Sequence, residues 1–316
     1  MRKIKTTLVI GAGTMGHGFA QLFALNNIPV FLVDEMDEFL RRAKSWIENN
    51  LDYMVELKEI EKSQIKPILD RINFTTDLKQ AAKKADYVLE AVPENLDMKK
   101  KIFQQLDEYT QPDVILSSNT SSFDINELSV VITRPERVIG THWYNPPQIT
   151  PCVEVIPSNA TNQETLDSIM DFLKGIGKVP TQCKSSPGFI GNRIQFAMAA
   201  EAFSIVEQGL ATPEEVDQIV RTSFGFRLGV YGPFEICDQA GLDVYEAIYE
   251  YLYIKLKKEQ FKPPAILKQF IEKGRLGLKN QKGFYDYKEK TSDMIKHERD
   301  RKLYDRLRLL QKEQKI

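Results

Sequence analysis

The chain has 316 residues, of which 42% are hydrophobic and 28% charged, and its formal net charge is −1. This balance is typical of a folded protein with about two domains, and a net charge so close to zero argues against nucleic acid or an anionic membrane as a partner. No apolar run approaches the ~20 residues needed to span a bilayer. The three cysteines are scattered without metal-ligand spacing, which predicts reduced thiols, no metal site and a cytoplasmic protein.

The N-terminal stretch predicts a strand, a tight turn, a helix and a second strand. Residues 6–10 are an apolar, β-prone run, and residues 11–16 read Gly-Ala-Gly-Thr-Met-Gly. An amphipathic run follows at 19–25, and another β-prone run follows at 29–33. This order of elements is the context in which a Gly-x-Gly-x-x-Gly turn binds a dinucleotide.

The three glycines of this turn have separate expected roles. Gly11 permits the tight turn, Gly13 lets the backbone approach a pyrophosphate, and Gly16 lets the helix pack close to the strand. The free N–H groups and the positive end of the helix dipole then favour phosphate groups. The alternative is a structural turn that binds no ligand.

The residue at the end of the second predicted strand bears on the choice of cofactor. Asp34 lies there, where a carboxylate would accept hydrogen bonds from an adenosine ribose and repel a 2′-phosphate. The sequence therefore predicts NAD as the cofactor. Arg41 and Arg42, in the next predicted helix, leave NADP as an alternative.

The rest of the N-terminal part predicts a sheet domain. Residues 37–70 are rich in charge and carry apolar residues at near-helical spacing, which indicates a long helical insertion, with a helical hairpin as one arrangement. Strands and helices then alternate, with strands expected at 86–92, 114–117, 137–142, 153–156 and 179–183. This alternation predicts an α/β fold, a Rossmann-type doubly wound parallel sheet over residues 1–185, with ligands at the carboxyl ends of the strands.

Beyond a Ser-Ser-Pro-Gly linker at 185–188, the pattern changes to helices. Helices are predicted at 189–208, 213–223, 241–258 and 264–273, which gives an all-α C-terminal domain over residues 186–316. The charged tail at 288–316 carries Ile295, Leu303, Leu307 and Leu310 at approximate helical spacing. Most of this tail is expected to be a solvated face.

One histidine and one glutamate are candidates for acid–base chemistry. His142 follows an apolar strand, and Glu154 lies in the neighbouring strand pattern. If these two strands are adjacent and antiparallel, the carboxylate reaches the imidazole, fixes its tautomer and stabilises its protonated form. From the residues alone, a structural histidine and a surface glutamate are an equally good interpretation.

Several motifs in order resemble the L-3-hydroxyacyl-CoA dehydrogenases, 3-hydroxybutyryl-CoA dehydrogenases among them. The resemblance covers residues 5–287 and rests on Gly-Ala-Gly-Thr-Met-Gly at 11–16, Glu-Asn-Leu at 94–96, Ser-Asn-Thr-Ser-Ser at 118–122, His-Trp-Tyr-Asn-Pro at 142–146, Val-Glu-Val at 153–155, Pro-Gly-Phe-Ile-Gly-Asn-Arg at 187–193, Gly-Pro-Phe-Glu at 232–235, Gly-Leu-Asp at 241–243 and Lys-Gly-Phe-Tyr at 282–285.

The resemblance implies an NAD-dependent oxidoreductase that interconverts an L-3-hydroxyacyl-CoA and its 3-keto form. It implies that His142 is the base, that Glu154 orients it, and that Ser121 and Asn192 hold the 3-oxygen of the substrate. It places these residues near the cofactor: Gly11, Gly13, Thr14, Met15, Gly16, Asp34, Glu94, Lys99, Ser121, Asn145 and Lys279. It also implies a homodimer formed largely through residues 189–287, with the tail at 288–316 as a candidate for a further contribution.

Departures from the family pattern leave the substrate open. An ungapped comparison places Asn50 and Leu57 where the family offers Ser and Lys to coenzyme A, and in a shifted register Lys58 or Lys62 takes the place of that lysine. The segment 142–147 reads His-Trp-Tyr-Asn-Pro-Pro instead of the more usual His-Phe-Phe-Asn-Pro-Val, which is closer to relatives acting on free hydroxy acids, such as gulonate or carnitine dehydrogenases. The segment 227–231 before Gly-Pro is likewise unusual. A catalytically inactive NAD-binding protein or a structural protein is the alternative of another class.

Overall fold

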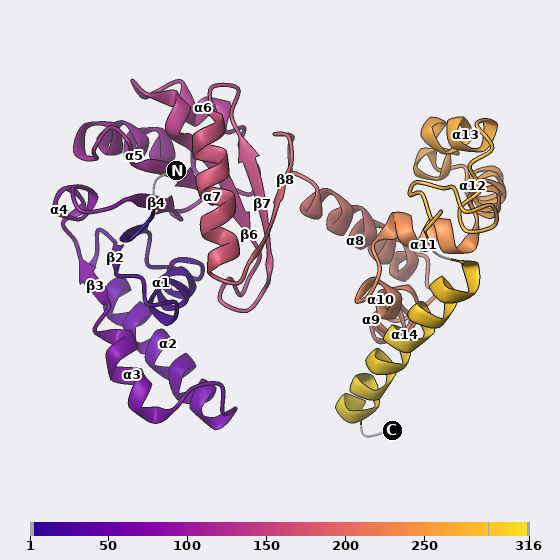
Figure 1. Ribbon diagram of the computed structural model, residues 1–316, viewed down its shortest axis with the longest axis horizontal. Helices are drawn as coiled ribbons and strands as arrows, with labels where there is room; N and C mark the ends of the chain where they lie inside the picture. Colours follow the sequence, from indigo (N-terminus) through magenta and orange to yellow (C-terminus); the bar gives the residue numbers. More distant parts are fainter. Residues whose placement is uncertain (1–2, 290, 315–316) are drawn as a thin grey trace. The chain divides into compact units, whose positions relative to one another are not determined.

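The computed structural model describes residues 3–289 and 291–314, which form two compact units that divide after Ala199 (Figure 1). Residues 1–2 of the predicted N-terminal domain, and residues 290 and 315–316 of the predicted tail, lie outside this description. Within the described residues, no helix is both long and apolar enough to cross a membrane.

The first unit is built on one eight-stranded sheet with the order β3-β2-β1-β4-β5-β6-β7-β8. Neighbouring strands are parallel, except that β6 and β7 are antiparallel, so β7 and β8 run opposite to the other six. The expected parallel sheet is therefore confirmed from β1 to β6 and wrong at this edge, where the condition stated for His142 and Glu154, adjacent antiparallel strands, is met. The strands are β1 (Thr7–Ile10), β2 (Val30–Val33), β3 (Ile72–Thr75), β4 (Tyr87–Glu90), β5 (Ile115–Ser118), β6 (Val138–Trp143), β7 (Cys152–Pro157) and β8 (Val179–Gln182).

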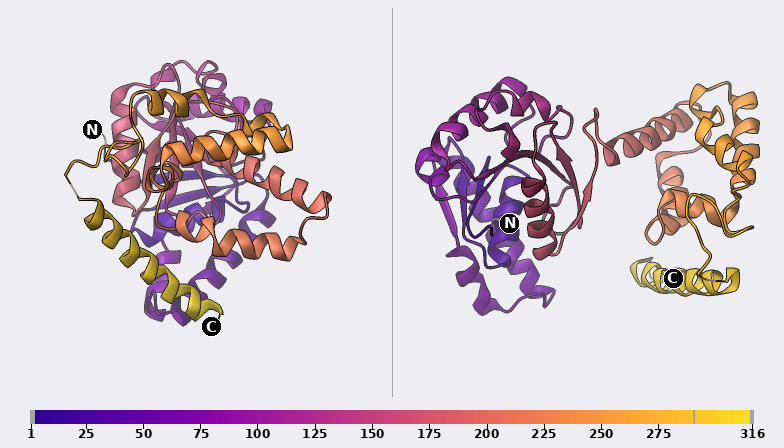
Figure 2. Two further views of the ribbon diagram at one scale, coloured as in Figure 1. Left: turned by 90° about the vertical axis from the view of Figure 1, so that its right-hand side faces the viewer. Right: turned by 45° about the horizontal axis from the view of Figure 1, so that its top comes forward.

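Helices cover both faces of this sheet, which confirms the doubly wound architecture (Figures 1 and 2). The helices of this unit are α1 (Gly16–Leu25), α2 (Asp37–Glu56), α3 (Lys62–Leu69), α4 (Leu78–Ala82), α5 (Leu96–Tyr109), α6 (Asn126–Ser129), η1 (Pro135–Arg137) and α7 (Gln163–Gly175). One buried cluster joins α1, α2 and α7 to the sheet, and the other joins α4, α5 and α6 to the opposite face.

The predicted insertion at 37–70 is a helical hairpin of α2 and α3. The buried side chains of α2, Leu40, Ala43, Ile47 and Leu51, recur at helical spacing, and with Ile68 of α3 they join the cluster of α1. The chain then returns to the sheet as β3, a strand that the sequence analysis did not predict. Only one of its four residues is buried, because β3 is the edge strand, so it lacks the apolar run typical of an inner strand.

The second unit is helical and contains α8 (Gly191–Glu207) from its middle onward, α9 (Pro213–Thr222), α10 (Phe224–Leu228), α11 (Pro233–Ala240), α12 (Leu242–Leu256), η2 (Glu259–Phe261), α13 (Ala265–Glu272) and α14 (Ser292–Gln314). Asp238 is buried at its centre and accepts hydrogen bonds from the amides of Phe284 and Tyr285 and the hydroxyl of Tyr287. These bonds hold the glycine-rich segment that follows α13 against α11.

The predicted tail forms the helix α14, which lies along the outside of the second unit (Figures 1 and 2). Lys302 packs over the ring of Tyr231, 5.3 Å from its centroid, and the guanidinium of Arg306 lies against Gly229. The tail therefore contacts the segment 227–231 that the sequence analysis found unusual, although most of its described side chains are exposed, as expected of a solvated face.

A buried ammonium group lies where β4 meets α5. Lys99 is 1% exposed, and its Nζ lies 2.8 Å from Oε1 of Glu90 and 3.2 Å from Oε2 of Glu94. Glu90 is fully buried and also accepts hydrogen bonds from the Ser118 hydroxyl and the Val92 amide. The charges are compensated only as a set, because removing one partner leaves an unpaired buried charge.

We predict that Lys99→Met lowers the free energy of unfolding by about 3–5 kcal/mol, because Glu90 then stays buried without its cation. The two tryptophans of the chain, Trp46 and Trp143, both lie in the first unit, so tryptophan fluorescence during urea unfolding reports on that unit alone.

Lys66→Met is the matched control. Lys66 pairs with Asp70 at the same 2.8 Å, but both side chains are exposed, so this loss is expected to stay under about 1 kcal/mol. Equal destabilisation by the two substitutions would contradict the role of burial.

Candidate active site

The glycine turn between β1 and α1 has the geometry that a dinucleotide requires. Gly11 has a φ of +100°, which disfavours other residues, and a Cβ at Gly16 would overlap the carbonyl oxygen of Gly11. A Cβ at Gly13 would meet nothing within 4 Å, so this side of the turn is open. Helix α1 follows Met15, and no side chain caps its N-terminus. Because Thr14 beside it is exposed, the backbone N–H groups in the first turn of α1 are available to an anion.

The end of β2 presents a carboxylate to this turn. Asp34 accepts a hydrogen bond from the Ala12 amide at 2.8 Å, which holds it beside the glycines. Arg42 packs between two aromatic rings, 4.8 Å from the centroid of Phe39 and 4.9 Å from that of Trp46. The residues present fit NAD, with an acidic side chain beside the turn and Arg42 engaged elsewhere.

His142 and Glu154 are brought together by the antiparallel pair β6 and β7. They are direct partners in the register of this pair, and Nδ1 of His142 donates to Oε2 of Glu154 at 2.8 Å. Both side chains are buried. Because Nδ1 is engaged, Nε2 is the nitrogen that remains able to take a proton from another molecule.

Glu154 accepts four hydrogen bonds, two on each oxygen. Oε2 accepts from His142 and from the Tyr144 hydroxyl, both at 2.8 Å, and Oε1 accepts from the amides of Ile190 and Gly191 at 2.9 and 3.0 Å. Burial by itself raises the pKa of this carboxyl, but the four donors outweigh burial and lower the pKa to about 2. Glu154 is therefore ionised at every pH near neutrality.

The loop after β5, which contains Ser121, is organised by Glu94. Its Oε1 accepts from the hydroxyls of Thr120 and Ser122 and from the amides of Ser121 and Ser122. Burial raises the pKa of Glu94, but these hydroxyls and Lys99 outweigh it, and the net shift is downward. Ser121 is exposed at the surface of this loop.

The remaining predicted residues lie in three places. Asn192 is in the first turn of α8, next to the Gly191 amide that binds Glu154, and Asn145 follows β6 and is exposed. Lys99 lies inside the protein, beneath the loops it supports. Lys279 belongs to the second unit, where its Nζ pairs with Asp243 at 2.7 Å.

Sequence reasoning missed two residues of this site. The sequence analysis placed Glu90 in a strand without giving it a role. Its position as a carboxylate at the end of a parallel strand could have marked it as a site residue. Tyr144 was noticed only as a departure from the family pattern, and its bond to Glu154 depends on tertiary structure. No group of three or more potential metal ligands occurs among residues 3–289 and 291–314.

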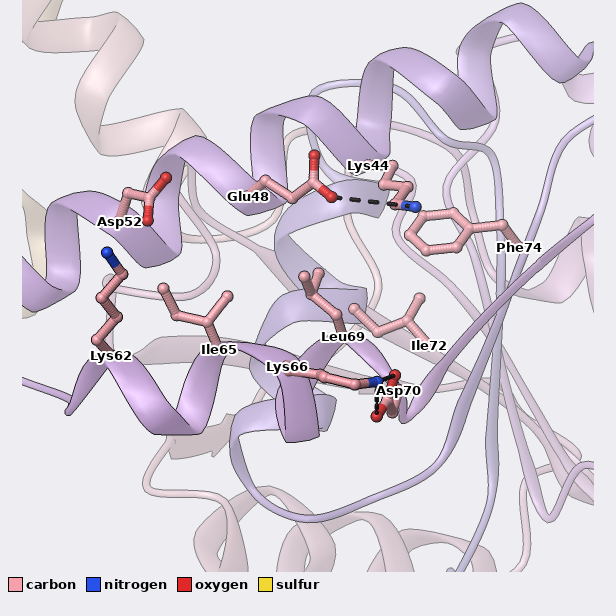
Figure 3. Close-up of a pocket in the computed structure, with 10 residues that line it drawn as sticks. All are labelled: Lys44, Glu48, Asp52, Lys62, Ile65, Lys66, Leu69, Asp70, Ile72 and Phe74. Carbon is pink, nitrogen blue, oxygen red and sulfur yellow. Dashed lines mark hydrogen bonds and ion pairs between the residues drawn. The ribbon is translucent and has the colours of Figure 1, made fainter.

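Two cavities differ in their relation to this chemistry. A cavity of about 430 Å³ adjoins Glu154, and most of the atoms that line it are apolar. Its other lining residues are Tyr144, Asn145, Thr150, Cys152, Thr181, Cys183, Ile190 and Gly191. A larger one of about 670 Å³ lies between α2, α3 and β3, and its charges are offset by pairs such as Lys44–Glu48 and Lys66–Asp70 (Figure 3). Of these two cavities, the one beside Glu154 is the one lined by residues of the predicted site.

The chain matches two family models in sequence order. Residues 6–186 match "3-hydroxyacyl-CoA dehydrogenase, NAD binding domain", and residues 188–287 match "3-hydroxyacyl-CoA dehydrogenase, C-terminal domain". The matched residues leave out the tail that contains α14.

Curated relatives and solved structures cover most of the chain. The probable 3-hydroxybutyryl-CoA dehydrogenase of Deinococcus radiodurans is 38% identical over 88% of this chain and 99% of that protein. The 5-formyl-3-hydroxy-2-methylpyridine 4-carboxylate 5-dehydrogenase of Mesorhizobium japonicum is 33% identical over 98% of this chain and 99% of that protein. The crystal structure of an Archaeoglobus fulgidus 3-hydroxyacyl-CoA dehydrogenase is 32% identical, covers 97% of this chain and 99% of its own, and has a TM-score of 0.80. With both domains of the family matched in order, the chain belongs to the 3-hydroxyacyl-CoA dehydrogenase family.

Proposed function

We propose that this protein catalyses the NAD-dependent oxidation of an L-3-hydroxyacyl-CoA, similar to 3-hydroxybutyryl-CoA, to the 3-ketoacyl-CoA, or the reverse reaction. The observation that carries this proposal is the buried hydrogen bond between His142 and an ionised Glu154, in the same unit as an open glycine turn. In this proposal residues 1–185 form the NAD-binding domain and residues 186–316 the substrate and dimerisation domain.

Oxidation of an alcohol requires that its hydroxyl proton and a hydride leave together. His142 takes the proton at Nε2, and Glu154 stabilises the imidazolium that forms, because its negatively charged Oε2 accepts the hydrogen bond from Nδ1–H. The chemistry that bound NAD supplies is acceptance of the hydride. Ser121 and Asn192 hold the 3-oxygen of the substrate, and as neutral donors they stabilise the carbonyl without placing another charge beside the base.

The cofactor is held by the turn at Gly11, Gly13, Thr14, Met15 and Gly16, by Asp34, and by the loops that carry Ser121 and Asn145. Glu94 and Lys99 contribute indirectly, because their bonds shape the loop that contains Ser121. Lys279 completes the proposed set from the second unit.

The second candidate is the same chemistry on a free 3-hydroxy acid, as in gulonate or carnitine dehydrogenases. It is favoured by the Mesorhizobium japonicum relative, which is named for a pyridine carboxylate and which this chain matches over 98% of its length. A catalytically inactive or structural protein is less well supported, because the His142–Glu154 bond would then have no use. We also infer a cytoplasmic location from the dispersed cysteines.

We predict that NAD is used in preference to NADP, because Asp34 lies where a 2′-phosphate would meet its charge. Asp34→Ser should reduce the NAD/NADP ratio of kcat/KM by roughly tenfold or more. The control is Asp37→Ser, which removes an exposed carboxylate from the first turn of α2. Equal use of both cofactors by the unchanged protein would contradict the assignment.

We predict that His142→Gln lowers turnover by ~10²–10⁴, the usual contribution of a general base, while NAD binding is kept. Turnover is followed by NADH absorbance, with coenzyme A thioesters of 3-hydroxy acids beside the free acids. Faster oxidation of thioesters supports the first candidate function and faster oxidation of free acids the second. Full activity of His142→Gln would refute the mechanism for both.

Glu154→Gln is the companion variant. It should also cost rate and lower the pH midpoint of the oxidation profile, because the carboxylate charge that favours the imidazolium is gone. The double variant should be little worse than the worse single one, since the two residues act as a unit.

We also infer a homodimer formed largely through residues 189–287. After Ala200 the buried apolar side chains of the described residues are only Ile236, Leu242 and Leu267, and α8 and α9 bury none. Phe196 and Phe203 of α8 are 67% and 70% exposed, as expected for a face that a second copy covers.

Light scattering at micromolar concentration is predicted to give twice the monomer mass. Deleting residues 288–316 should weaken the dimer if α14 contributes and leave the mass unchanged if it does not. A monomer mass for the full chain would contradict the homodimer.

A further inference from the structure

The hydroxyl of Tyr144 competes with the imidazole for one oxygen atom. Tyr144 and His142 each donate to Oε2 of Glu154 at 2.8 Å, and their rings lie edge to face with centroids 4.9 Å apart. Tyr144 follows β6 in the connection to β7, so it reaches Glu154 from outside the strand pair. The bond is additional to the two backbone amides that already hold the other oxygen.

The surroundings keep this hydroxyl in place. A Cβ at Gly191 would overlap the Tyr144 hydroxyl, so the first residue of α8 must be small for the bond to form. The neighbouring cavity is lined by apolar groups and by the thiols Cys152 and Cys183. Apolar surroundings strengthen electrostatic coupling between groups that share a hydrogen bond.

We propose that Tyr144 is a positioning residue that sets the basicity of His142 by sharing Oε2 of Glu154 with the imidazole. A hydroxyl that donates to a carboxylate oxygen withdraws part of its charge, so the same oxygen is a weaker partner for Nδ1–H. The imidazolium is then stabilised less, and His142 gives up its proton at lower pH.

The other titratable groups around Glu154 do not supply this effect. Cys152, on β7, and Cys183, after β8, face the same carboxylate, and burial, followed by the charge of Glu154, raises the pKa of both thiols. Burial and the bond to Glu154 likewise raise the pKa of the Tyr144 hydroxyl. All three groups therefore stay neutral, and among them the Tyr144 hydroxyl is the one that donates to Glu154.

The test is Tyr144→Phe, which removes the hydroxyl and keeps the ring. The pH midpoint of kcat/KM for oxidation should rise by about half to one pH unit. The control is Tyr87→Phe, which removes a buried hydroxyl that bonds to Thr141 instead, on the opposite face of β6 from His142. Its midpoint should stay unchanged.

A second readout does not depend on catalysis. The chain has three histidines, so the Cε1–H proton resonances are few, and His142→Gln identifies the one that belongs to His142. The titration midpoint of this resonance in the protein without substrate should rise in Tyr144→Phe by the same amount as the kinetic midpoint. The kinetic readout rests on the proposed function, whereas this titration tests the inference even if His142 is not the base.

The double variant Glu154→Gln/Tyr144→Phe tests whether Tyr144 acts through the carboxylate. Against Glu154→Gln alone, loss of the hydroxyl should add no further shift. An unchanged or lowered midpoint in Tyr144→Phe, or an equal rise in the presence of Glu154→Gln, would overturn the proposal. A loss of activity without a change of midpoint would also overturn it, because it would indicate only a structural role.

Discussion

The carboxyl edge of the sheet depends on one buried cation that must remain compensated. The Lys99 side chain is buried, so Glu90 and Glu94 have to stay close to its ammonium group. Both carboxylates also accept hydrogen bonds from the end of β5 and from the loops after β4 and β5. The cost of burying a charge is large enough to fix the shape of backbone that has no regular secondary structure. The exposed Ser121 therefore owes its position to electrostatics beneath it more than to its own contacts.

The reversal of chain direction at β6 provides the second constraint. Parallel strands bring only their ends to one edge, whereas an antiparallel neighbour places His142 and Glu154 directly opposite each other. The pair lies on the face of the sheet that α4, α5 and α6 cover, and Thr141 and Trp143 point to the other face, toward α1. The glycine turn and the His142–Glu154 hydrogen bond thus come from different strands of one sheet.

Much of this could be predicted from the sequence, because the signals are local. Strand, turn and helix over residues 6–25 follow from periodicity and glycine spacing, and the helical hairpin follows from apolar residues at helical spacing. The edge strand β3 could not be predicted, since its exposure removes the apolar pattern. The burial of Lys99 and the hydrogen bond from Tyr144 to Glu154 could not be predicted either. The neighbouring sequence does not indicate which distant residue a lysine or tyrosine side chain will contact in the folded protein.

The attachment of Glu154 to the start of α8 has a mechanical consequence. This helix begins in the first unit and ends in the second, so it is the covalent link between them. Half of the donors on Glu154, the amides of Ile190 and Gly191, belong to its beginning. If the helix tilts about this point, the carboxylate loses or gains donors, and the proton affinity of its imidazole partner changes with it. The helix that joins the two units along the chain is in this way also bonded to the partner of His142.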